Sequence, residues 1–155
     1  MKQKVKIAFI ILILIALVYE IFHPFIYQFN YYSSVGIDNK YMYDDIVKDL
    51  GEPQRVIKVD ADWQVNYDGF NIIFETPLHS SAFRRVEITG SQYRFGWWKI
   101  GVGTSRKKIE SVYRHIKKTK DMPSDEIRII DYNNWVLFYF DENDKVSKIC
   151  ITDDM

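Results

Sequence analysis

The sequence predicts an α+β fold: an N-terminal transmembrane helix, then two tandem helix–β-hairpin–strand repeats forming one antiparallel sheet with helices on one face. Three observations lead to this prediction. Residues 7–19 form an uninterrupted apolar run. Apolar positions with helical spacing and with strand spacing alternate along residues 36–152. The same order of landmarks occurs twice in that range, and such internal similarity indicates repeated structural units.

The apolar run, IAFIILILIALVY, follows Lys2, Lys4 and Lys6. Its thirteen residues rise about 20 Å as a helix, short of the roughly 30 Å hydrocarbon core. Apolar residues continue beyond it, so we expect residues 7–27 to span a membrane as an uncleaved signal anchor. A cleaved signal peptide is the alternative, although Ala16-Leu17-Val18 is a poor cleavage site. The lysines then predict a single-pass cell-membrane protein with an extracytoplasmic C-terminal domain.

These expectations divide the chain into two parts. Residues 1–29 form a cytoplasmic tip and membrane anchor, and residues 30–155 form the extracytoplasmic domain. Within that domain we expect repeat 1 at about 36–89, a linker strand at 90–100 and repeat 2 at about 101–152. The single cysteine, Cys150, excludes an internal disulfide, which in an exported protein favours a bacterial source.

In repeat 1 a helix is predicted by four apolar residues that share one helical face: Tyr43, Ile46, Val47 and Leu50. Gly51 and Pro53 end that helix. Strand periodicity follows at residues 56–59, 63–67, 70–75 and 84–89, with a hairpin turn at Asp68-Gly69.

Repeat 2 has the same helical face sixty-six positions later, at Ile109, Val112, Tyr113 and Ile116. Strands are predicted at residues 127–132, 135–140 and 147–152. Alternation makes Cys150 face away from the helices, beside Glu87 and within reach of thiol reagents. The predicted core comprises Ile46, Val47, Leu50, Val86, Ile88, Val112, Ile116, Ile149 and Ile151.

Leu50-Gly51-Glu52-Pro53, followed by Tyr67-Asp68-Gly69, resembles the repeats of β-lactamase inhibitor protein and the related small outer-membrane assembly lipoproteins. The resemblance covers about residues 36–152. It implies a sheet with helices on one face and a concave open face that binds protein. The second repeat departs from the pattern, because Ile116-Lys117-Lys118-Thr119 stands where Leu-Gly-x-Pro is expected. No binding residue is transferred.

Charge is strongly segregated although the net charge is zero. Residues 40–75 carry four basic and eight acidic side chains, residues 84–120 eleven basic and two acidic, and residues 121–154 three basic and nine acidic. This order fits internal neutralisation between packed units. The alternative is a basic surface for anionic lipid, wall polymer or an acidic protein.

Two basic-aromatic features are candidate partner-binding sites. Arg106, Lys107 and Lys108 open the second helix at its positive end, where the macrodipole disfavours cations. The other feature is the 93–99 segment, which in a strand shows one of its adjacent tryptophans to the side that the helices leave open. An aromatic core between the repeats is the alternative for this segment. Its candidate residues are Tyr93, Arg94, Trp97, Trp98 and Lys99.

No nucleophile–base pair, metal-ligand spacing or cofactor motif is recognisable, so we expect no enzyme activity, metal or cofactor. The three histidines, His23, His79 and His115, lie far apart in the sequence. The sequence therefore favours a membrane-anchored protein-binding module, such as an inhibitor or immunity protein, with no nucleic-acid partner. The alternative is an envelope assembly or structural factor that contacts anionic lipid or wall polymer through the basic middle segment.

Overall fold

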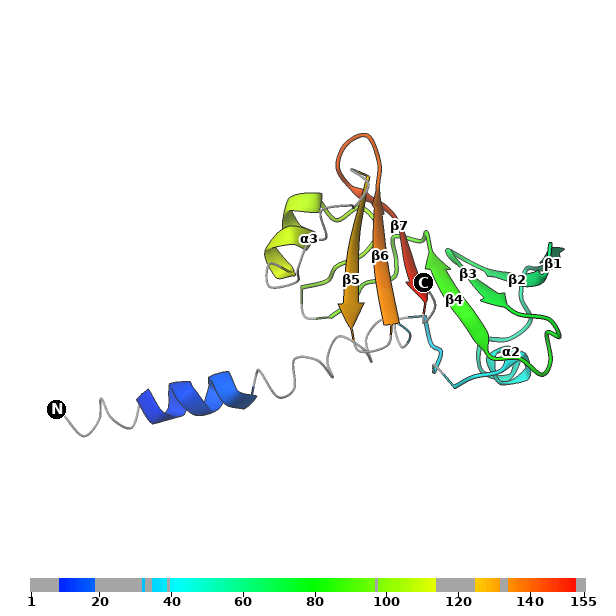
Figure 1. Ribbon diagram of the computed structural model, residues 1–155, viewed down its shortest axis with the longest axis horizontal. Helices are drawn as coiled ribbons and strands as arrows, with labels where there is room; N and C mark the ends of the chain where they lie inside the picture. Colours follow the sequence, from blue (N-terminus) through cyan, green and yellow to red (C-terminus); the bar gives the residue numbers. More distant parts are fainter. Residues whose placement is uncertain are drawn as a thin grey trace.

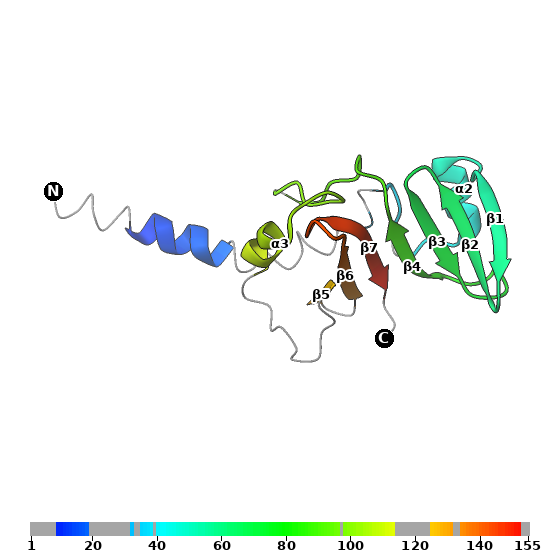
Figure 2. The same ribbon diagram turned by 90° about the horizontal axis from the view of Figure 1, so that it is seen from above.

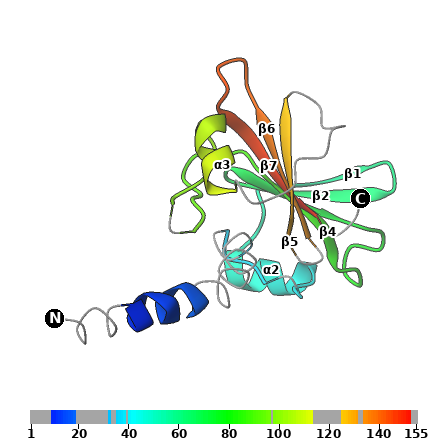
Figure 3. The same ribbon diagram turned by 60° about the vertical axis from the view of Figure 1, so that its left-hand side comes forward.

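The computed structural model describes residues 9–18, 32, 35–38, 40–96, 98–113, 125–131 and 134–152. Its strands form one seven-stranded antiparallel sheet in the order β1-β2-β3-β4-β7-β6-β5, and β4 and β7 lie side by side in the middle (Figure 2). Viewed obliquely, the strands fan out strongly, as the twist of β-sheets requires (Figure 3). The strands are β1 (Arg55–Val59), β2 (Asp62–Tyr67), β3 (Phe70–Phe74), β4 (Phe83–Ile88), β5 (Glu126–Asp131), β6 (Asn134–Phe140) and β7 (Val146–Thr152).

Three helices are described: residues 9–18, α2 (Tyr43–Leu50) and α3 (Arg106–Val112). The backbone N–H of Met42 donates to the Asp45 carboxylate over 3.1 Å at the start of α2. Gly51 ends α2 with a φ of 82°, a conformation that glycine adopts without a steric penalty. In Figure 1, α2 lies beside the β1–β4 half of the sheet and α3 beside the β5–β7 half.

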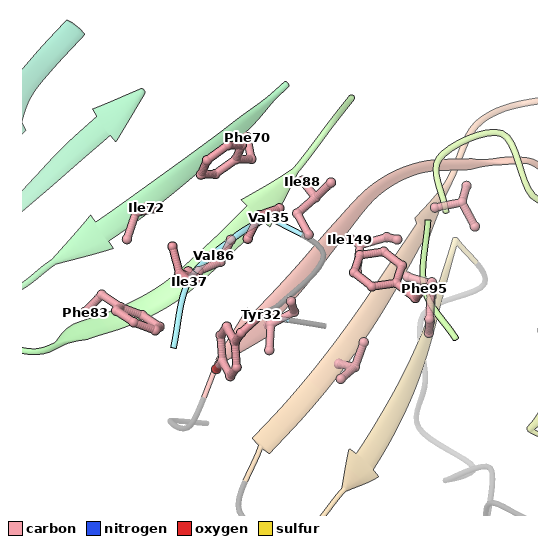
Figure 4. Packing of buried hydrophobic residues seen from close by; sticks show 14 of the residues in the cluster. Tyr32, Val35, Ile37, Phe70, Ile72, Phe83, Val86, Ile88, Phe95 and Ile149 are labelled. Atoms are coloured by element: carbon pink, nitrogen blue, oxygen red, sulfur yellow. The ribbon is translucent and has the colours of Figure 1, made fainter. Parts of the chain in front are cut away.

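The buried hydrophobic residues form one core cluster on one face of the sheet, and Figure 4 shows the part of it made by β3, β4, β7 and the segment before α2. One row of cross-strand neighbours runs from Ile72 through Val86 and Ile151 to Val136, and each is at most 1% exposed. This row crosses the β4–β7 boundary, so the two halves of the sheet share one core.

The predicted core residues are largely confirmed. Five are buried: Ile46, Val86, Ile88, Ile149 and Ile151. Three others are half-buried, namely Val47, Leu50 and Val112, and Ile116 lies outside the described residues. Residues before α2 also contribute, since the Tyr32 and Phe83 rings meet at 5.4 Å between centroids (Figure 4).

The prediction of a transmembrane signal anchor is wrong. The described helix at residues 9–18 has ten residues and rises about 15 Å, half the hydrocarbon thickness. None of the helices in the described part of the chain has the length and apolar character needed to cross a membrane. The predicted localisation as a single-pass membrane protein is wrong for the same reason. The lysines before residue 8 and the continuation at residues 19–27 lie outside the described residues.

The predicted architecture of a membrane helix and two tandem repeats is also wrong. The chain folds into a single, sheet-rich unit, to which the part after α2 contributes four strands and the described part after α3 contributes three. The 90–100 segment, expected to be a linker strand, contains turns and one isolated bridge between Phe95 and Ile100 in its described residues. Regular spacing of landmarks could not reveal this, because it does not determine which strands of the two parts pair with each other.

Candidate binding face of the sheet

The strand register divides the side chains into two faces. The covered face carries the core and contacts both helices: the Tyr43 and Phe74 rings lie 5.9 Å apart, and the Tyr113 and Phe138 rings 5.8 Å apart. Alternate residues point to the opposite side, and we call that side the open face. The open face comprises Arg55, Ile57, Val59, Asp62, Gln64, Asn66, Asn71, Ile73, Arg85, Glu87, Glu126, Arg128, Trp135, Leu137, Tyr139, Lys148, Cys150 and Thr152.

Three apolar residues of the open face are buried although they do not belong to the core. Ile73 is 5% exposed, Leu137 4% and Cys150 6%, and all three are absent from the core cluster on the covered face. Leu137 and Cys150 are cross-strand neighbours. The open face therefore buries three apolar side chains, which we call its apolar floor.

Charged side chains surround this floor. Arg85 Nε lies 3.4 Å and Lys148 Nζ 3.7 Å from the same Glu87 oxygen, and the Lys148 ammonium lies 4.6 Å from the centre of the Tyr139 ring. We call these four residues, together with the ion pair between Arg128 and Glu126 on β5, the charged cluster. Because β4, β7, β6 and β5 are successive neighbours, the cluster extends across four strands.

The carboxylates of the charged cluster lie deeper than the cations. The Glu87 side chain is 22% exposed, against 47% for Arg85 and 36% for Lys148. Glu126 is 7% exposed, against 32% for Arg128. Solvent, or a docked molecule, therefore meets the cations first.

The predicted position of Cys150 is confirmed and its predicted accessibility is wrong. Cys150 is the direct cross-strand neighbour of Glu87, as the alternation requires. It is nevertheless buried, and burial, followed by the Glu87 charge, raises the pKa of the thiol from 9.0 to about 11. The side chains of a sheet face bury one another, which strand periodicity alone does not reveal.

We expect Cys150 in the folded chain to react with a thiol reagent at pH 8 at least about 100-fold more slowly than an ordinary thiol, because its thiolate fraction is that much smaller. Labelling rates with and without urea measure this. The reference is a Lys107→Cys, Cys150→Ala chain, whose thiol replaces an exposed side chain. Equal rates for the two folded chains would contradict the burial of Cys150.

The structure packs Tyr93 and Trp98, two of the candidates in the 93–99 segment, against the core on the covered face. The Tyr93 ring packs edge-on against Phe70 at 5.4 Å, and its hydroxyl donates to the Asp68 carbonyl over 2.8 Å. Trp98 packs against the core, whereas Arg94 and Lys99 are exposed. Trp97 lies outside the described residues. The role of the 93–99 candidates in partner binding stays a prediction. The described residues of this segment do not form the strand on which that prediction was based.

The basic candidates on α3 do not behave alike. Arg106 Nε lies 2.8 Å from an Asp144 oxygen, and its guanidinium lies 3.9 Å from the centre of the Phe140 ring. Lys107 and Lys108 are exposed. Arg106 therefore links α3 to the β6–β7 turn, and of these three residues only Lys107 and Lys108 are exposed.

The charged cluster was not recognised from the sequence. Its one local signal is the alternation in Arg85-Val86-Glu87-Ile88, where charged residues take every second position. The partners on β5, β6 and β7 are brought together only by strand pairing. No group of three or more His, Cys, Asp or Glu residues that could hold a metal ion occurs among the described residues.

No known protein family and no curated protein matches this sequence. Solved structures do match. A cysteine-rich secretory protein from Staphylococcus aureus subsp. aureus Mu50 is 15% identical, with a TM-score of 0.51 over 70% of this chain and 42% of that chain. A DUF4309 family protein from Bacillus subtilis subsp. subtilis str. 168 is 11% identical, with a TM-score of 0.49 over 74% of this chain and 79% of that chain.

The match to the staphylococcal structure, at 15% identity, shows a similar fold alone, and this chain spans less than half the length of that protein. Neither structure bears on the resemblance to β-lactamase inhibitor protein, which stays a prediction.

Proposed function

We propose that this chain is a binding module for a protein partner and that the open face of the sheet is its docking surface. One observation carries the proposal: the open face combines a buried apolar floor with an ordered set of charged and aromatic side chains. Such a combination is typical of the centre of protein interfaces, where Arg, Tyr and Trp are enriched.

A simpler explanation of these polar side chains is that the open face only contacts water, because antiparallel sheets commonly expose one polar face to solvent. Against that account, Glu126 is buried and the Glu87 side chain is only 22% exposed. Removing an ion pair from water has an unfavourable desolvation free energy, and a face that serves only as solvated surface does not require it. Charged side chains normally stay in water, and departures from such a rule are expected at functional sites.

The second function expected from the sequence, a factor that contacts anionic lipid or wall polymer through the basic middle segment, has less support. Two basic residues of that segment are paired with acidic residues from neighbouring segments. Arg84 Nε lies 3.2 Å from a Glu75 oxygen, and Arg106 pairs with Asp144. These pairs favour internal neutralisation for part of the segment. An inhibitor or immunity role, and the absence of enzyme activity, stay predictions.

Site-specific photocrosslinking tests the docking surface. A benzophenone side chain at Asn71, half-buried on β3 of the open face, should give a discrete adduct with one protein in cells that make the full chain. The same group at the exposed Lys48 of α2, on the covered side, is the matched control and should give none. Equal adducts from both positions, or an adduct from Lys107 alone, would overturn the proposal.

A further inference from the structure

We infer that the partner presents an acidic protein segment, whose carboxylates bind the Arg85 and Lys148 side chains of the open face. This inference rests on the proposed function and names the chemistry of the partner. It follows from the arrangement of charges in the charged cluster.

The charged cluster has an excess of positive charge at its surface. Three cations, Arg85, Arg128 and Lys148, stand over two carboxylates, Glu87 and Glu126. In each ion pair the cation is the more exposed member, by 47% to 22% for Arg85 and Glu87. A docked molecule therefore meets positive charge, and complementary potentials favour an anionic partner.

Arg85 and Lys148 also have N–H hydrogen-bond donors that their contact with Glu87 does not use. Arg85 and Lys148 share one oxygen of Glu87, at 3.4 and 3.7 Å, and Arg85 makes this contact through Nε. A guanidinium has five N–H donors in a planar fork that matches a carboxylate, and an ammonium has three. Glu87 thus orients both side chains while leaving donors available for a second carboxylate.

The neighbouring side chains favour a protein segment over a lipid surface. Ile73 and Leu137 are at most 5% exposed, so a ligand of the open face contacts mainly its polar and aromatic side chains. Asn71, the half-buried cross-strand neighbour of Glu87 on the same face, carries an amide that both donates and accepts hydrogen bonds. Peptide groups require such dual partners, whereas lipid phosphates only accept.

The test measures binding of a fluorescent polyglutamate peptide of about ten residues to the full chain by anisotropy, at about 50 and 300 mM salt. We expect salt-sensitive binding that weakens at least about tenfold in the double variant Arg85→Gln, Lys148→Gln. The matched control is Lys40→Gln, Lys48→Gln, which removes the same charge from exposed lysines near α2 and should bind like the native chain. Equal melting temperatures would establish that all three chains are folded.

Several results would overturn the inference. The first is that the peptide does not bind at low salt. The second is that the control variant loses as much affinity as the Arg85 and Lys148 variant. The third is that affinity falls only in the variant Lys107→Gln, Lys108→Gln. Binding to vesicles with about one third phosphatidylglycerol, lost in the Arg85 and Lys148 variant while the peptide stays unbound, would assign the site to lipid instead.

The photocrosslink separates this inference from the proposed function. If the Asn71 adduct persists unchanged when Arg85 and Lys148 are replaced by Gln, the acidic segment is excluded and the docking surface stands. If the chain that keeps Arg85 and Lys148 gives no adduct from the crosslinker at position 71, the docking surface itself is excluded.

Discussion

Replacing Phe138 with Ala should lower the free energy of unfolding by about 3–5 kcal/mol, as expected for removing a large ring from a core that relaxes only partly. Phe138 lies on β6 with 0% exposure, and its ring is 5.8 Å from that of Tyr113, next to α3. Its cross-strand neighbours Ile127 and Ile149 are buried as well. Urea unfolding followed by tryptophan fluorescence measures the change.

The matched control is Val59→Ala at the end of the edge strand β1. Val59 is 47% exposed, so its truncation should cost less than about 0.5 kcal/mol. A difference between the two variants of less than about 1 kcal/mol would contradict the position of Phe138 in the core. A loss of cooperativity in Phe138→Ala would indicate that the two halves of the sheet unfold separately, contrary to a shared core.

Gly101→Ala should destabilise the chain by about 2–3 kcal/mol, because a new methyl group enters a site with no room for it. A Cβ at Gly101 would collide with the backbone carbonyl oxygen of Tyr93 and lie 2.9 Å from Cδ of Arg94. Backbone atoms cannot move aside as a flexible side chain does. The 93–101 loop must therefore open, which also displaces Tyr93 from Phe70.

Gly103→Ala is the control for Gly101→Ala. Gly103 has a φ of 87°, and a Cβ on this residue would meet no heavy atom of the described chain within 4 Å. Ala at this position therefore costs only the conformational strain, about 1 kcal/mol. Thermal unfolding of both variants compares the two effects. If Gly103→Ala is the more destabilising, the close approach of Gly101 to Tyr93 is not present in the folded chain.

Local patterns in the sequence determined most individual elements. The spacing of Tyr43, Ile46 and Leu50, with Gly51 after them, predicted α2 within its observed bounds. Period-two alternation located β2 to β7 to within about one or two residues, because inward and outward side chains alternate along any half-buried strand. The same alternation correctly placed Cys150 on the face of the sheet that carries Glu87.

Tertiary structure alone decided how those elements assemble. Pairing of β4 with β7 joins residues more than sixty positions apart, and no local pattern specifies such a contact. It merges the two halves into one sheet, gathers Arg85, Lys148 and Tyr139 on the open face, and buries Cys150 between neighbouring side chains. The 93–99 segment looked like a strand because its residues suit strands. It folds instead onto the covered face, where burial of Phe95 and Trp98 against the core outweighs local propensity.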